Sequence, residues 1–213
     1  MPTMTPRQAG QLFKRLREAN PEPRTELEYK DAYTLLVAVI LSAQATDVGV
    51  NKATRKLFLV ADTPEKMVAL GEAGLTEHIK TIGLFRNKAR AVIAMSQQLL
   101  AEHDGRVPAN REALEKLPGV GRKTANVVLN SAFGKPTIAV DTHVFRVANR
   151  TGLARGQTPL EIEQQLEAVV PRAYRKDAHH WLILHGRYVC LARKPRCPDC
   201  VISDLCQYGA KTV

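Results

Sequence analysis

Apolar residues recur three or four positions apart along most of the chain, which is the spacing of amphipathic helices. Leu12 and Leu16 share one face of the first such segment, and Ala91 and Met95 begin a stripe along a longer one. Residues 32–43 are apolar on nearly every side, which predicts a central buried helix. In all, the pattern predicts helices over residues 7–18, 32–43, 48–60, 64–70, 75–81, 86–103, 111–116, 122–133, 142–150, 159–169 and 173–187.

Helix-capping residues support these boundaries. Thr63 and Thr158 each precede a proline, as an N-cap precedes a proline at the first helical position. Glycines such as Gly134 stand where helices are expected to stop. Residues 136–140 have the composition of a short strand, but no other segment offers a partner strand. We therefore predict an all-α fold.

The charge balance adds a partner class to this picture. The 213 residues include 31 Lys and Arg against 21 Asp and Glu, a net charge of +10, which favours a polyanionic partner. Nucleic acid is the first candidate and an anionic membrane surface the second. The longest apolar run, residues 35–41, is too short to span a bilayer, and residues 1–24 lack the apolar core of a signal peptide. We expect a cytosolic protein, or a nuclear one if the cell has a nucleus.

The segment Leu117–Ala125 joins two predicted helices through a turn that holds two glycines. Glycine permits a tight turn and a close approach of backbone to a partner, and the N–H groups at the start of the next helix attract anions. A plain connection between two helices is the alternative interpretation. In a basic protein the full pattern favours contact with DNA phosphates, through Gly119, Val120, Gly121 and Arg122.

Lys123 follows this turn, in the first turn of the next helix. A lysine amine can attack the anomeric carbon of a damaged nucleotide, displace the base and form a Schiff base, and β-elimination then breaks the strand. Binding a phosphate is the alternative role. Asp141 favours the catalytic role, because a carboxylate can accept the lysine's proton and stabilise the developing sugar cation. An N-cap for the following helix is the ordinary role of such an aspartate.

All four cysteines lie close together near the C-terminus. Reduced compartments disfavour disulfides, so such a cluster predicts a metal centre. Paired Cys-x2-Cys units are common in zinc sites, but only one such pair exists here, so spacing alone leaves zinc and a 4Fe-4S cluster equally open. The predicted ligands are Cys190, Cys197, Cys200 and Cys206.

The loop between the first two cysteines carries three cations and no acidic residue. A metal centre that holds both ends of the loop would present these cations in a small space, which suits contact with DNA phosphates. A solvated basic loop is the alternative. The three cations are Arg193, Lys194 and Arg196.

Together these motifs resemble the endonuclease III family of helix-hairpin-helix glycosylases, nearly from end to end. The hairpin, the lysine, the aspartate and the cysteine spacing all fit. So do four further motifs, Leu41–Asp47, Ile82–Leu84, Asp141–Arg146 and His185–Tyr188.

The resemblance implies two helical lobes flanking a DNA-binding cleft. One is a six-helix domain over residues 25–134, and the other joins residues 1–24 to 135–213 and holds a 4Fe-4S cluster. It implies a base-excision enzyme that removes oxidised pyrimidines from duplex DNA and cleaves abasic sites. Lys123 would be the Schiff-base nucleophile and Asp141 the catalytic carboxylate.

The resemblance also assigns DNA-inserting roles to Gln44 and Leu84, which enter the duplex when the damaged nucleotide is flipped out. Phe85 and Arg86 depart from the residues that many relatives carry beside this loop. We expect a monomer in the cytoplasm of a bacterial cell, associated with the nucleoid.

Three alternatives compete with this interpretation. An adenine glycosylase shares the hairpin, aspartate and cluster, but such enzymes lack a lysine at the position of Lys123 and usually add a domain beyond the cluster. A non-catalytic DNA-binding module would need the basic loop and hairpin without Lys123 and Asp141. A zinc-bound RNA-binding protein would lack the colour of an iron–sulfur cluster.

Overall fold

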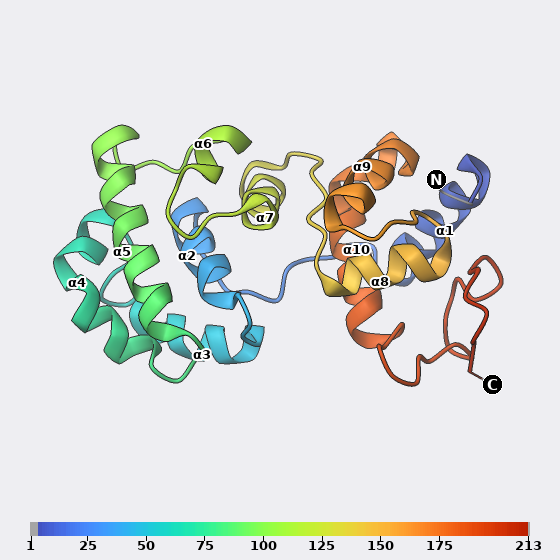
Figure 1. The fold of residues 1–213 in the computed structure, drawn as a ribbon, viewed down its shortest axis with the longest axis horizontal. Coiled ribbons are helices and arrows are strands. Elements are labelled where there is room, and N and C mark those ends of the chain that lie inside the picture. Colours follow the sequence, from blue (N-terminus) through green and yellow to red (C-terminus); the bar gives the residue numbers. More distant parts are fainter. Residues whose placement is uncertain (1–3, 213) are drawn as a thin grey trace. The chain divides into compact units, whose positions relative to one another are not determined.

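The computed structural model describes residues 4–212, and every regular element in that range is a helix (Figure 1). The all-α prediction is therefore confirmed. No helix in the described range is long and apolar enough to cross a membrane. In chain order the elements are α1 (Pro6–Ala19), α2 (Ala32–Ser42), α3 (Asp47–Leu57), α4 (Pro64–Ile79), α5 (Phe85–Glu102), α6 (Arg111–Glu115), α7 (Arg122–Phe133), α8 (Thr142–Thr151), α9 (Pro159–Val169), the 3₁₀ turn η1 (Arg172–Tyr174) and α10 (Arg175–Tyr188).

The chain divides into two compact units. It passes from the first unit to the second between Arg24 and Thr25, and it returns between Gly134 and Lys135. The first unit contains α1, α8, α9 and α10 together with the cysteine segment, and the second contains α2 to α7. The N-terminal helix therefore packs with the last third of the chain, a long-range pairing that helical periodicity cannot reveal.

Helix α2 is the central element of the second unit. Residues 33–41 are all buried, and the helix packs against α3, α5 and α7. Asp31 begins α2 as its N-cap and accepts a hydrogen bond from the backbone N–H of Thr34, 2.8 Å away. The buried hydroxyl of Tyr33 lies 2.7 Å from that of Ser96 on α5, which satisfies both groups. The predicted central helix is thus present.

Aromatic packing joins α1 to η1 and α10 in the first unit. The ring of Phe13 lies 6.0 Å from that of Tyr174 and 6.3 Å from that of Trp181, measured between centroids. The Trp181 indole N–H donates to the backbone carbonyl of Asn20 at 2.7 Å. Tight packing of α8 on α10 depends on Gly186, since a Cβ there would lie 2.8 Å from the Cβ of His143. These contacts fix the helices that precede the cysteine segment.

The predicted helices over 64–70 and 75–81 form one element, α4, and the break between them is present at Gly71, where φ is 71° and ψ is 171°. Residues 136–140 form no strand, in agreement with the lack of a partner strand in the sequence, and Ile138 and Ala139 lie fully buried in the first unit. The structure differs from the prediction at the helix expected over 173–187, which begins at Arg175, after the 3₁₀ turn η1.

Candidate functional site

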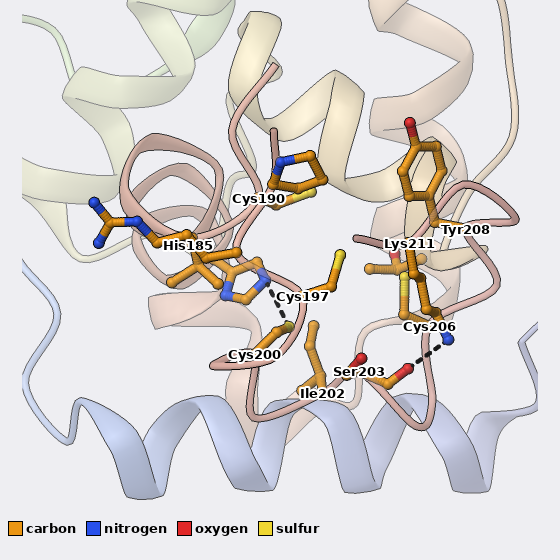
Figure 2. Close-up of a pocket in the computed structure, with 13 residues that line it drawn as sticks. His185, Cys190, Cys197, Cys200, Ile202, Ser203, Cys206, Tyr208 and Lys211 are labelled. Carbon is orange, nitrogen blue, oxygen red and sulfur yellow. Dashed lines mark hydrogen bonds between the residues drawn. The ribbon is translucent and has the colours of Figure 1, made fainter. Parts of the chain in front are cut away.

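The four cysteines line one cavity in the first unit, as Figure 2 shows. All four are half-buried and none forms a disulfide. Burial raises the pKa of the Cys200 and Cys206 thiols. A thiolate in such surroundings requires a compensating cation, which a bound metal centre provides.

The donor set of this cavity fits an iron–sulfur cluster. Four sulfur ligands from one short segment are the usual support of a four-iron cluster. No three His, Cys, Asp or Glu side chains within residues 4–212 converge in the way that a single metal ion requires. A cluster of several irons accepts ligands that stand farther apart than those of one zinc ion.

His185 contributes a nitrogen to the same cavity from the last turns of α10. Its Nε2 lies 3.6 Å from the Sγ of Cys200 (Figure 2). Burial lowers the pKa of His185 to about 4, so the ring is neutral at pH 7 and can donate one N–H. The backbone N–H groups of Val189 and Cys190 both donate to the His185 carbonyl, at 2.9 and 2.7 Å. The backbone of His185 and that of the first cysteine are therefore held together.

Two arginines on α8 bind the chain around the first cysteine, and sequence reasoning missed both. Arg146 donates to the carbonyls of Cys190 and Gly186, at 2.9 and 2.6 Å. Arg150 donates to the carbonyl of Leu191 at 2.7 Å. The sequence held one indication of this shared role: the two arginines are four residues apart, which places both side chains on one face of a helix.

The hairpin in the second unit has the geometry that its glycines predict. Gly119 adopts a φ of 77°, and a Cβ there would lie 2.9 Å from the Cβ of Ala91 on α5. Gly121 is the N-cap of α7 and has no side chain to bind the first N–H groups of the helix. Arg122 and Lys123 begin α7, and both are exposed. The start of α7 is therefore accessible to an anion from outside the protein.

Two exposed turns of the second unit hold non-glycine residues in the left-handed region. Gln44 has a φ of 53° and Leu84 a φ of 58°. The turns lie side by side, since a Cβ at Gly83 would be 3.6 Å from the Gln44 carbonyl oxygen. Leu84 is 52% exposed although its side chain is apolar. Backbone strain and an exposed apolar side chain together are typical of a functional loop.

Asp141 is the N-cap of α8 in the first unit. Its Oδ1 accepts hydrogen bonds from the backbone N–H groups of His143 and Val144, at 2.9 and 2.8 Å. Both bonds use Oδ1, so the capping role does not occupy Oδ2, which can interact with a substrate. The structural role that the sequence suggested for Asp141 is thus real, and it is compatible with a catalytic one.

The loop between the first two cysteines presents its cations to solvent. Arg193, Lys194 and Arg196 are all exposed, whereas Pro195 between them is buried. Lys194 adopts a φ of 50°, the left-handed region that lysine rarely occupies. The buried proline anchors the loop, the three cations stay exposed, and Arg196 also borders the cysteine cavity.

Comparison with known proteins places these features in a family. A model of the HhH-GPD superfamily of base excision DNA repair proteins matches residues 37–172. Endonuclease III of Haemophilus influenzae is 61% identical over 201 residues, which cover 94% of this chain and 95% of that protein. Endonuclease III of Escherichia coli K12 is 59% identical with the same coverage. The chain belongs to the endonuclease III family.

Solved structures of this family agree with the fold. A trapped covalent intermediate between endonuclease III and DNA matches with a TM-score of 0.91 and 43% identity, over 97% of this chain and 98% of that one. A non-covalent complex of endonuclease III with DNA matches with the same TM-score. The predicted family resemblance is confirmed, and the adenine glycosylase alternative is set aside.

The comparisons also decide the nature of the metal centre. A model of the iron–sulfur binding domain of endonuclease III matches residues 190–206, from the first cysteine to the last. The 4Fe-4S prediction is confirmed and the zinc alternative is set aside.

Proposed function

We propose that the protein is a base-excision DNA glycosylase that removes oxidised pyrimidines from duplex DNA and cleaves the resulting abasic site. The observation that carries this proposal is the trapped covalent intermediate with DNA in a close structural relative. A covalent intermediate requires a nucleophile on the protein. Lys123 is the candidate, because it is exposed in the first turn of α7, directly after a hairpin that suits a DNA phosphate.

The chemistry assigned to Lys123 depends on a neutral amine. The amine attacks the anomeric carbon, the base leaves, and the resulting imine makes the neighbouring sugar proton acidic enough for β-elimination. Oδ2 of Asp141 stabilises the cationic sugar, while Oδ1 is held by the start of α8.

The remaining predicted residues bind or distort the DNA in this proposal. Gln44 and Leu84 stand on adjacent strained turns, and they enter the duplex where the damaged nucleotide leaves it. The hairpin from Gly119 to Arg122 binds phosphate through backbone N–H groups. The cations at 193, 194 and 196 bind phosphate through their charge. None of these contacts selects a base sequence. An enzyme that searches DNA for damage requires such sequence-independent binding.

We further propose that the two units act as the two domains of the family, residues 25–134 as the hairpin domain and residues 1–24 with 135–213 as the cluster domain. The protein would act as a monomer in the bacterial cytoplasm, where its DNA substrate lies.

Borohydride trapping tests the proposal. The protein is incubated with duplex DNA that carries one abasic site, and borohydride reduces any Schiff base to a permanent crosslink. We expect a crosslink with the wild type and with Lys52→Ala, which removes an exposed lysine of α3, and none with Lys123→Ala. An iron-loaded wild type that forms no crosslink would refute the lyase assignment and favour a non-catalytic DNA-binding module.

A further inference from the structure

We propose that Arg150 and His185 set the reduction potential of the 4Fe-4S cluster by donating hydrogen bonds to two different ligand sulfurs. Arg150 is on α8 and His185 is on α10, so the two donors come from separate helices of one unit. Neither residue is a cysteine ligand, and neither has a part in the DNA chemistry proposed above. Both act on the cluster through the sulfurs that hold it.

Arg150 is fixed by four contacts, and one of them is to a ligand sulfur. Its Nη1 lies 3.5 Å from the Sγ of Cys190 and donates to the Leu191 carbonyl at 2.7 Å. Its Nη2 donates to the Ala192 carbonyl at 3.0 Å, and its guanidinium lies over the Tyr208 ring, 4.4 Å from the centroid. A guanidinium held in this way keeps a permanent positive charge beside the first sulfur.

His185 contacts the third ligand of the segment. Its Nε2 lies 3.6 Å from the Sγ of Cys200, and the residue is only 8% exposed (Figure 2). A cluster-bound sulfur is a thiolate, which can only accept a hydrogen bond, so the imidazole must be the donor. The His185 backbone is held at the end of α10, because the N–H groups of Val189 and Cys190 both bind its carbonyl.

The expected effect on the cluster follows from its charge. Reduction adds one negative charge, which is spread over the iron and sulfur atoms. A donor or a cation beside a sulfur stabilises this charge, and the effect is large where few other polar groups surround the sulfurs. The two residues should therefore raise the potential, and removing either should lower it. Arg150 should have the larger effect because it carries a full charge.

Voltammetry of the iron-loaded, full-length protein on an electrode tests this proposal, since the electrode supplies the single electron. We expect Arg150→Met to shift the equilibrium between oxidised and reduced cluster about tenfold toward the oxidised form, which is about 59 mV for one electron. His185→Leu should shift it in the same direction by less. The double variant should show the sum, because the donors serve different sulfurs.

Conservative variants separate this role from simple support of the cysteine segment. Arg150→Lys keeps the charge and His185→Gln keeps an N–H donor, so both should recover part of the shift. Ile202→Val alters a buried side chain of the same cavity that cannot donate to a sulfur, and it keeps the backbone N–H that bonds to the Cys200 sulfur, so it should leave the midpoint unchanged. A variant that binds less cluster still reports a valid result, because the midpoint potential of the cluster does not depend on the fraction of protein that carries it. Loaded variants at both positions with the wild-type midpoint would overturn the proposal.

Discussion

Lys88 is a buried lysine whose ammonium group has no hydrogen-bond partner among the described residues. It lies one turn into α5, after the strained turn at Leu84, and it is only 5% exposed. Burial lowers the pKa of its amine. A buried polar group without a partner costs about 1–3 kcal/mol of folding free energy in protein mutational data. We therefore predict that Lys88→Met, which has similar length and no charge, makes the protein more stable.

The gain in stability should appear as a higher Tm and should depend on pH. A gain of about 1–3 kcal/mol corresponds to a rise in Tm of roughly 2–12 °C for a chain of this size. Because the folded pKa lies below the unfolded value near ~10.4, the unfolded chain holds the proton more tightly between these two pKa values. The stability of the wild type should therefore rise with pH across that interval. The advantage of Lys88→Met should be complete below the folded pKa and should shrink as the pH approaches about 10.4.

Anaerobic urea unfolding of both proteins at pH 7 and pH 10 measures this difference. Lys52→Met is the matched control, because Lys52 is exposed on α3 of the same unit, and its effect should stay within about 0.5 kcal/mol. A Lys88→Met protein that is less stable than the wild type at pH 7 would refute the reasoning. It would show that the ammonium is compensated in solution and contributes to the fold.

Three further predictions concern single contacts. Gly119→Ala should lower stability by roughly 1–3 kcal/mol in urea unfolding, because the alanine must adopt a positive φ and press on Ala91, and an unchanged midpoint would contradict this. Asp141→Asn keeps a good N-cap, so its circular dichroism melt should match that of the wild type. Base removal by this variant should be about 100-fold slower or more in a single-turnover assay. Equal rates for variant and wild type would exclude a catalytic role for the Asp141 carboxylate. Trp181→Phe should cost about 0.5–1.5 kcal/mol because it removes the hydrogen bond from the indole to the partly buried Asn20 carbonyl, and chemical denaturation that shows no loss would disprove this.

Much of this protein was readable from the sequence because the relevant signals are local. Helical spacing and N-cap residues such as Thr63 and Thr158 depend on neighbours within one turn, and the structure contains both caps. The metal centre was readable for the same reason, since all its predicted ligands lie within 17 consecutive residues, 190–206. The choice between zinc and iron–sulfur was not readable from spacing, because the same thiolates bind both.

Only the tertiary structure decided the features that depend on residues far apart in the chain. Helix α1 packs against α10, which joins the first residues of the described chain to residues 175–188. The burial of Lys88 arises from helices packed around it, which a lysine's own position does not reveal. The contacts of Arg150 and His185 with sulfur join residues 40 and 15 positions apart. Periodicity identifies one face of one helix, whereas the identity of the atoms opposite that face is settled only when the whole chain packs.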